Sequence, residues 1–405
     1  MSTTFDLSAH ITPETAELKP SLIRAFNQEI SSIPGILKLT LGEPDFDTPQ
    51  SIRDAATASL KAGHTHYGPS AGTPALRAAI SAFLLRRRGL SYPADDIVVS
   101  EGAGEALSAV LTAFLGAGGF MLYPSPAFYI YRSLALLNGS TPVALDTSDT
   151  NYVLAPATLR AALEKLDGAP AVLVLNSPNN PTGTALTAEQ LQALAEVIRD
   201  YNVLVVSDDV YADLCFDAPF HSIAEYLPDR TIIVDSTSKS FAMTGWRIGY
   251  FTGPHDMVAA AAKVHQVHVV SPATFSMDAA TVAYESCDAD IDAMAAEYRR
   301  RRDYFGAAMR NLGYETTNPA GAFYLYVRIP DDFVGTAMEY ARAMAREAKV
   351  ACVPGDAFEE ITGPDASPSP SRHVRFSYAA DMETLHEAVR RLEEWRKPLS
   401  ETSAQ

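Results

Sequence analysis

Short apolar runs alternate with helical spacers between residues 97 and 252, and this alternation constrains the fold more than any other feature. The spacer at 187–201 repeats apolar residues three and four positions apart and begins with Thr187, a residue type that caps helices. The order strand, helix, strand predicts an α/β fold, a mostly parallel seven-stranded sheet with helices on both faces. The seven runs, each bounded by Gly, Pro, Ser or Asp, are DIVVS, GFMLYP, TPVALD, PAVLVLNSP, NVLVVSDD, TIIVDS and RIGYFTG.

The pattern changes after about residue 285. A long charged helix is expected at 292–313, and the strand-like runs AGAFYLYVRIP and HVRFSYAA alternate with further helices. We predict a large domain at 45–284, a small C-terminal α+β domain at 285–405, and an N-terminal arm with part of the small domain at 1–44. The segment 361–372, rich in Pro, Ser and Gly, is expected to be a mobile surface loop.

Charge and composition exclude several classes of protein. The 405 residues include 32 Lys and Arg against 49 Asp and Glu, a net charge of −17, which argues against nucleic acid or an anionic membrane as partner. The chain starts without a signal-like segment and has no run long enough to span a membrane, so a cytoplasmic protein is expected. Cys215, Cys287 and Cys352 lack metal-binding spacing, so we expect buried, reduced thiols and no metal site.

The segment STSKSFAMTGWRIGY at 236–250 directly follows the predicted strand TIIVDS. Ligands of such sheets bind at the carboxyl ends of the strands. A lysine there, Lys239, is a candidate for imine formation with an aldehyde, and Ser236, Ser238 and Arg247 could hold a phosphate.

The same residues also spell S-x-x-K, the nucleophile motif of serine β-lactamases. That mechanism requires S-D-N and K-T-G elements, whereas the chain offers only Ser207-Asp208-Asp209 and no K-T-G. A serine/lysine turn without any chemistry is the third interpretation of the segment taken alone.

Eight segments, in order along nearly the whole chain, resemble the class I and II aminotransferases, fold-type I enzymes that use pyridoxal 5′-phosphate. The resemblance implies a cofactor-binding large domain. It is strongest to the bacterial aspartate, aromatic and N-acetyl-diaminopimelate aminotransferases. Besides the lysine segment, the matching blocks are LGEPDFDTP (41–49), HTHYGPSAGTPALRAAI (64–80), EGAGEAL (101–107), PSPAFYIY (124–131), NSPNNPTG (176–183), SDDVY (207–211) and VRFSYA (374–379).

The resemblance implies roles around the cofactor ring. Lys239 matches the lysine that forms the Schiff base and moves the proton, and Asp208 matches the carboxylate that keeps the ring nitrogen protonated. Tyr211 and Asn180 match the donors to the phenolic oxygen. Phe128 matches the aromatic that stacks on the ring, with core packing as the alternative.

The family's phosphate site implies a further group of residues. The amides of Ala103 and Gly104, where a strand turns into a helix, would meet the phosphate opposite Ser236, Ser238 and Arg247. Glu101 replaces a residue that is often small and polar in the family, which leaves the set of amides open. Tyr67 matches a residue that reaches the phosphate of the neighbouring subunit, which implies a homodimer with shared active sites.

For the substrate, Arg375 matches the arginine that binds the α-carboxylate, with Gly42 offering a backbone N–H and Asn180 nearby. Phe323 and Tyr324 are expected either to cover the site or to pack in the core. The implied function is transfer of an amino group between an L-amino acid, aromatic or acidic, and a 2-oxo acid such as 2-oxoglutarate.

Two alternatives remain on the same fold. A carbon–sulfur lyase or a cyclopropane-forming synthase would share Lys239, Asp208 and Arg375. A transcriptional regulator would need a helix-turn-helix module, for which the blocks, beginning near residue 35, leave no room. His265 and His268 carry no recognisable signature and are expected to be satisfied helical histidines.

Overall fold

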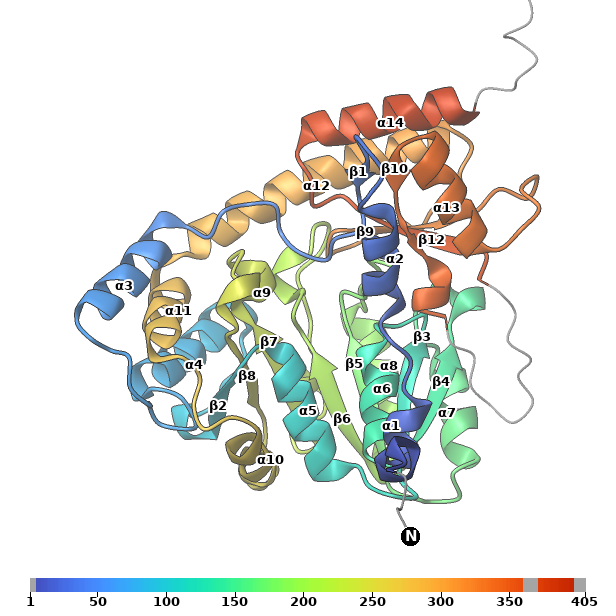
Figure 1. Cartoon of the computed structure of the whole chain (residues 1–405). Coiled ribbons are helices and arrows are strands. Elements are labelled where there is room, and N and C mark those ends of the chain that lie inside the picture. The colour runs from blue at the N-terminus through green and yellow to red at the C-terminus, as the bar shows by residue number, and fades with distance from the viewer. Residues whose placement is uncertain (1–4, 360–370, 397–405) are drawn as a thin grey trace, which may run out of the picture.

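The computed structural model describes residues 5–359 and 371–396. Its main feature is a seven-stranded sheet in the order β2-β8-β7-β6-β5-β3-β4, in which only β8 runs against its neighbours (Figure 1). The predicted α/β fold with a mostly parallel seven-stranded sheet is confirmed. The strands are β2 (Ile97–Ser100), β3 (Phe120–Ser125), β4 (Thr141–Asp146), β5 (Ala171–Asn176), β6 (Val203–Asp208), β7 (Thr231–Ser236) and β8 (Gly249–Thr252).

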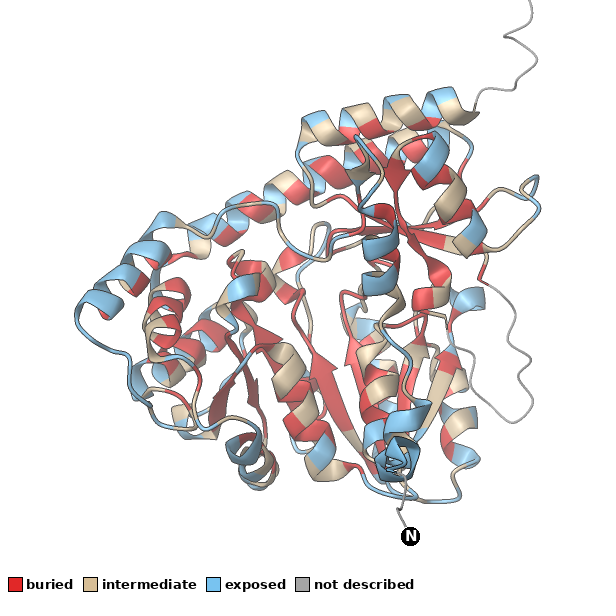
Figure 2. Ribbon diagram, in the orientation of Figure 1, coloured by how far each residue is buried: buried red, intermediate tan, exposed pale blue. Residues whose placement is uncertain are grey.

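Helices cover both faces of this sheet, and the sequence of β5 shows why. Val172 and Val174 pack with one group of helices, whereas Leu173 and Leu175 pack with another on the opposite face. A strand buried on both faces must be apolar at every position, and Figure 2 shows the central strands buried along their length. The helices of this part are α3 (Gln50–Lys61), α4 (Pro74–Arg88), α5 (Ala103–Phe114), α6 (Ile130–Leu137), α7 (Pro156–Glu164), α8 (Ala188–Arg199), α9 (Thr237–Ser240), α10 (His255–His268) and α11 (Thr274–Ser286).

Helix α8 illustrates how the sequence sets local structure. The Thr187 hydroxyl accepts a hydrogen bond from the Gln190 amide, and the Gln190 side chain accepts one from the Thr187 amide. This capping box satisfies two amides that a helix start would leave unpaired. The predicted helix and its cap are confirmed.

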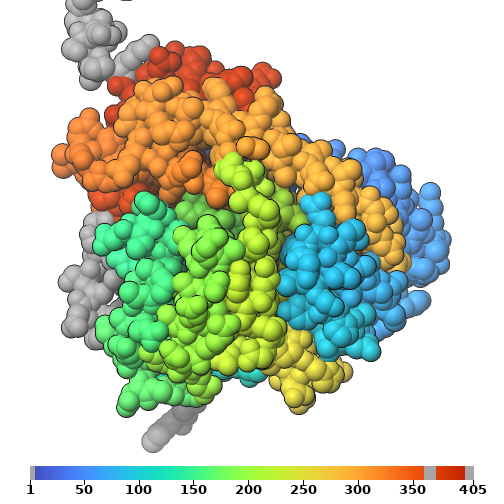
Figure 3. Space-filling view, turned by 180° about the vertical axis from the view of Figure 1, so that it is seen from behind, coloured from blue at the N-terminus to red at the C-terminus, as the bar shows by residue number. Residues whose placement is uncertain are grey.

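A smaller unit lies above the carboxyl edge of the sheet, and seen from behind it (orange) rests on the large unit (green) (Figures 1 and 3). Its three strands form an antiparallel sheet in the order β11-β12-β9, and the short β1 pairs in parallel with β10. The elements are α12 (Asp288–Asn311), β9 (Tyr324–Arg328), α13 (Ala337–Glu347), β10 (Val350–Ala351), β11 (Val353–Pro354), β12 (His373–Ser377) and α14 (Met382–Arg396).

The N-terminal segment crosses both units, with α1 (Pro13–Glu17) beside α6 and α2 (Leu22–Ile30) contributing Phe26 and Ile30 to the core of the small unit. Strand β1 (Leu37–Lys38) belongs to that unit through its pairing with β10. The domain boundaries at 44/45 and 284/285 stay predictions. The expected loop at 361–372 falls, apart from its last two residues, outside the described residues.

The cysteines, membrane-spanning helices and metal-binding clusters can now be compared with the expectations from the sequence. All three cysteines are free thiols, but only Cys287 and Cys352 are buried, so the expectation of full burial is wrong for the half-buried Cys215, which follows the short helix Ala212–Leu214. Across residues 5–359 and 371–396, no helix is long and apolar enough to cross a membrane. Within the same residues, no cluster of three His, Cys, Asp or Glu side chains could hold a metal ion.

Strand β8 meets the start of α5 so closely that only glycine fits at position 249. A Cβ atom there would lie 2.6 Å from the carbonyl carbon of Gly102, 2.7 Å from the amide nitrogen of Ala103 and 2.9 Å from the carbonyl oxygen of Asp235. All three are backbone atoms, so a side chain must displace the N-terminus of α5.

We therefore predict that Gly249→Ala lowers the free energy of unfolding by about 1–3 kcal/mol, as overpacking typically does. Urea unfolding followed by circular dichroism measures this. Gly116→Ala is the matched control, since nothing lies within 4 Å of its added Cβ. Equal stabilities of the two variants would contradict the close approach.

Candidate functional site

A cavity of about 400 Å³ opens at the carboxyl edge of the sheet, between the large and small units. Twelve of the thirteen candidate site residues line it, although they come from distant parts of the chain. Their individual roles stay predictions, but the structure brings them together. They are Gly42, Ala103, Gly104, Phe128, Asn180, Asp208, Tyr211, Ser236, Ser238, Lys239, Arg247 and Arg375.

Lys239 lies in the short helix α9, which begins where β7 ends. Its Nζ donates a hydrogen bond to the carbonyl oxygen of Gly42, 2.5 Å away. Burial, together with the positive charges of Arg247 and Arg375, lowers the pKa of Lys239 to about 8. A larger fraction of this amine is therefore neutral and nucleophilic near pH 7 than for an ordinary lysine. Gly42 enters the site here through its carbonyl group, whereas the sequence suggested its N–H.

Asp208 is the last residue of β6, and its carboxylate is buried. The Tyr131 hydroxyl donates to its Oδ2 at 2.7 Å, and the Asn176 side chain donates to its backbone carbonyl at 2.9 Å. Burial raises the pKa of Asp208 to about 6, although the hydrogen bond from Tyr131 and the charge of Lys239 act in the opposite direction. A cation placed against this buried carboxylate would be strongly favoured.

The start of α5 forms an anion-binding corner of the cavity. Gly102, at φ 79°, precedes the helix and no side chain caps its first amides. Arg247 lies over this turn, donating to the carbonyls of Thr244 at 2.7 Å and Glu101 at 3.3 Å, and a Cβ at Gly102 would collide with its guanidinium. Free amides, a helix dipole and a guanidinium together suit a phosphate.

Arg375 is 2% exposed in β12 and lines the cavity from the small unit. It donates to Asn180 Oδ1 at 2.7 Å and to the Thr40 carbonyl at 2.9 Å, while its Nε has no partner. The guanidinium stacks over the Tyr324 ring at 4.3 Å. Within the described residues it forms no ion pair, so a buried cation lines the cavity without a counter-charge.

Tyr211 and Tyr324 share a hydrogen bond of 2.7 Å between their hydroxyl groups. Tyr324 lines the cavity, whereas Phe323 packs in the core of the small unit with its ring 4.8 Å from that of Tyr324. The sequence left open whether these two aromatics cover the site or pack in the core. Tyr324 lines the cavity, and Phe323 packs in the core. Phe128 also lines the cavity, and its ring packs edge-on against Tyr129 and Tyr131.

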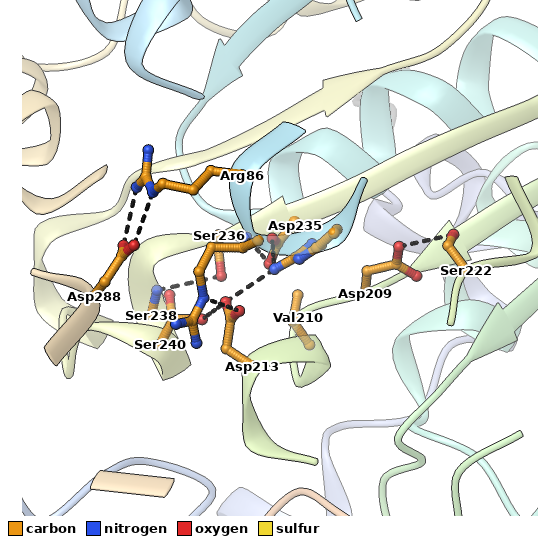
Figure 4. Close-up of polar contacts among 12 residues, drawn as sticks. Arg86, Asp209, Val210, Asp213, Ser222, Asp235, Ser236, Ser238, Ser240 and Asp288 are labelled. Atoms are coloured by element: carbon orange, nitrogen blue, oxygen red, sulfur yellow. Dashed lines mark hydrogen bonds and ion pairs between the residues drawn. The ribbon is translucent and has the colours of Figure 1, made fainter. Parts of the chain in front are cut away.

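A buried charge network lies around α9, the short helix that carries Lys239, and Figure 4 shows its members Asp213 and Asp235 near Ser236 and Ser240. Arg88 from α4 pairs with Asp213 at 3.0 Å and with Asp235 at 2.8 Å. Asp213 accepts a hydrogen bond from the Ser240 hydroxyl and Asp235 accepts one from the Ser236 amide, at the two ends of α9. The network therefore anchors the helix that carries Lys239.

Asp209 lies beside this network and does not line the cavity. It accepts hydrogen bonds from Ser207 and Ser222, and burial raises its pKa to about 8. The remaining candidate, Tyr67, is 83% exposed and lies away from the cavity of its own chain.

Sequence reasoning missed several residues that shape the cavity. Tyr131 and Asn176 lie in the family-like segments 124–131 and 176–183. Asn176 could have been found from the sequence, because it is a polar residue at the end of a buried strand. Arg24, which lines the cavity, and Thr40, whose carbonyl accepts a hydrogen bond from Arg375, offered no such signal, because both belong to the N-terminal segment.

The comparisons with known proteins agree with this geometry. The family described as aminotransferase class I and II matches residues 34–392. The chain is 34% identical to a probable N-acetyl-LL-diaminopimelate aminotransferase of Bacillus subtilis over 95% of both chains. It is 37% identical to an aspartate aminotransferase of Pyrococcus abyssi, covering 93% of this chain and 95% of the relative. The aspartate aminotransferase of Thermus thermophilus, solved with maleate, superposes with a TM-score of 0.87 at 32% identity, covering 95% and 99%.

The chain belongs to the class I and II aminotransferases. It is a transaminase that uses pyridoxal phosphate, and its substrates are small molecules, an amino acid and an oxo acid. The relatives that match nearly the whole chain are named aminotransferases, which favours this activity over a lyase or a serine acylase.

The residues of this aminotransferase fit its cofactor. The uncapped start of α5 and the guanidinium of Arg247 suit the phosphate, the buried Asp208 suits a protonated ring nitrogen, and Lys239 supplies an amine. The partnerless Nε of Arg375 is free to take a carboxylate.

Tyr131 provides a test of the electrostatics of this aminotransferase. Its hydrogen bond lowers the pKa of Asp208, so Tyr131→Phe should raise that pKa above about 6. Carbon-13 NMR of labelled aspartate in the cofactor-free protein follows the titration. Tyr304→Phe, a change in a half-buried ring beside His386, should leave it unmoved. An unchanged Asp208 midpoint in the Tyr131 variant would show that the bond is not formed in solution.

Proposed function

We propose that this aminotransferase transfers amino groups between aromatic or acidic L-amino acids and a 2-oxo acid such as 2-oxoglutarate, with the cavity residues in the roles given below. The observation that carries the proposal is the buried guanidinium of Arg375, which has no counter-charge among the described residues and faces the cavity that Lys239 also lines. An α-carboxylate is common to both substrates and would complete the pairing.

Pyridoxal phosphate, when bound, supplies an aldehyde that takes up the amino group and a ring that accepts electrons. Lys239 anchors it and, as a free amine, moves the proton of the substrate's α-carbon, for which a pKa near 8 is well suited. Asp208 holds the proton of the ring nitrogen. Tyr211 and Asn180 would donate hydrogen bonds to the phenolic oxygen, and Phe128 would hold the ring.

The phosphate would be held by the amides of Ala103 and Gly104 together with Ser236, Ser238 and Arg247. The α-carboxylate would bind Arg375 and Asn180, beside Gly42. Support for this division comes from the positions of the two arginines, which line the same cavity from different elements.

The remaining lining residues of the cavity suggest which side chains are accepted. Ile23, Leu107, Tyr129 and Ile130 give the cavity apolar surface, which suits an aromatic donor. Arg24 lines it as well, from α2, and would meet the second carboxylate of an acidic donor or of 2-oxoglutarate.

The two arginines give a paired experiment. Arg375→Lys keeps the charge but loses the fork, so KM should rise about tenfold or more for every donor and acceptor. Arg24→Leu should raise KM for aspartate, glutamate and 2-oxoglutarate only, leaving an aromatic donor unchanged. Steady-state kinetics with a panel of donors measures both effects. The proposal fails if Arg375→Lys alters neither half-reaction, and the assignment of Arg24 fails if Arg24→Leu acts equally on all donors.

We further propose a cytoplasmic homodimer with shared active sites. Tyr67, Val267 and Val270 are exposed apolar side chains on two segments that are tied together by the hydrogen bond from Thr274 to the His66 carbonyl. A second cavity of about 470 Å³ is lined by Glu101 and Arg247, among others, and would admit a side chain of the partner subunit.

If Tyr67 reaches the partner's phosphate, Tyr67→Phe should weaken cofactor retention by about 1 kcal/mol, the usual value of one hydrogen bond, without affecting folding. Val267→Asp should shift the protein toward monomers, because it buries a charge at the interface. Light scattering and cofactor titration measure the two effects. An active monomer would overturn the dimer.

A further inference from the structure

His265 lies in α10 with 1% of its surface exposed, and oxygen acceptors face both of its ring nitrogens. Nδ1 is 3.1 Å from each carboxylate oxygen of Glu105, and Nε2 is 2.9 Å from the backbone carbonyl oxygen of Ser70. An ionised carboxylate and a carbonyl can only accept hydrogen bonds. Both contacts are therefore hydrogen bonds only when both nitrogens carry a proton, which makes the ring an imidazolium.

The two acceptors belong to two parts of the shared site. Glu105 lies in the first turn of α5, two residues after Ala103. Ser70 lies three residues after Tyr67, in a loop otherwise held by hydrogen bonds from Thr274 to the His66 carbonyl and from the Val99 amide to the Ala71 carbonyl. His265 is thus a direct tie between this loop and the start of α5.

The charge of His265 also matters at the start of α5. Glu105 accepts a hydrogen bond from the Glu101 amide and so places a negative charge at the same positive helix end that a phosphate would use. An imidazolium offsets that charge, whereas a neutral ring would leave a carboxylate repelling the phosphate.

We propose that His265 is a positioning residue that, as an imidazolium, holds the Tyr67 loop against α5 and offsets Glu105, so that retention of pyridoxal phosphate depends on its proton. The inference rests on the proposed phosphate site and dimer. It adds a residue that touches neither the cofactor nor the substrate.

The sign of the pH dependence follows from the groups around the ring. Burial lowers the pKa of His265, but the hydrogen bond and charge of Glu105, with Glu101 nearby, raise it above the ordinary value overall. His268 on the same helix is 3.9 Å from Glu105, and Phe251 on β8 packs edge-on against the ring. Because the pKa is raised on folding, the tie is complete at low pH and is lost as the pH rises through the folded value.

The experiment follows cofactor release from the holoenzyme, by loss of visible absorbance after dilution, between about pH 6 and 9. The native protein should release the cofactor faster above the His265 midpoint. His265→Gln should release it about tenfold faster at low pH, the factor that a charge-assisted hydrogen bond carries, and should lack the pH step. Glu105→Gln should keep a step but move it to lower pH, a shift that a purely structural role would not produce. His255→Gln, a surface control, should behave as the native protein does.

Nitrogen-15 NMR of labelled histidine in the native protein tests the same claim without any variant, so poor folding of a variant does not decide the matter. His265 should titrate with both nitrogens protonated at low pH. A neutral ring throughout, a native step in His265→Gln, or an unmoved midpoint in Glu105→Gln would each overturn the inference. A monomer, or a protein that binds no cofactor at Lys239, would instead contradict the proposed site, and the NMR titration still reads His265 in that case.

Discussion

The register of three parallel strands is the constraint on which the site depends. Asn176 at the end of β5 is the direct partner of Asp208 at the end of β6, and β7 continues the row and delivers Ser236 and then Lys239. In parallel strands all carboxyl ends meet at one edge, so acid and amine come from separate crossovers. A slip of one residue in β6 would turn Asp208 to the other face and remove the acid from the cavity.

The acid and the amine are buried at the carboxyl edge of the sheet, beside a network of buried ion pairs. Arg88 faces Asp213 and Asp235, Arg87 lies 3.8 Å from Asp213, and Asp209 is close by. Burial raises the pKa of Asp209 and Asp235, although the charge of Arg88 acts in the opposite direction. Removing one partner from such a network typically costs about 3–5 kcal/mol, because a charge is left uncompensated. The Ser236 amide and the Ser240 hydroxyl donate hydrogen bonds to Asp235 and Asp213 of this network (Figure 4). The network therefore fixes the position of α9.

The fold was readily predicted because its signals are local. The central strands β5, β6 and β7 are largely apolar runs, as burial on both faces demands. Thr187 marks a helix start through a hydrogen bond only three residues away. The contacts that tune the site are not local. The bond from Tyr131 to Asp208 joins residues 77 positions apart, and that from Arg88 to Asp213 joins residues 125 apart. Neither pair leaves a periodic pattern in the sequence, so resemblance suggested the site residues but not what sets their charge.

The net charge of −17 also has a consequence for substrates that are themselves anions. At physiological salt, charges beyond about 8 Å are largely screened, so the surface acids act weakly on an anion inside the cavity. The anion meets four cationic side chains there, with Asp208 as the acid among the described lining residues: Arg24, Lys239, Arg247 and Arg375. Burial is the main cause of the lowered pKa of Lys239, and the positive charges of Arg247 and Arg375, which attract a phosphate and a carboxylate, add to it. Anion binding and a reactive amine therefore both follow from a buried cavity lined by cations, which an acidic surface leaves largely undisturbed.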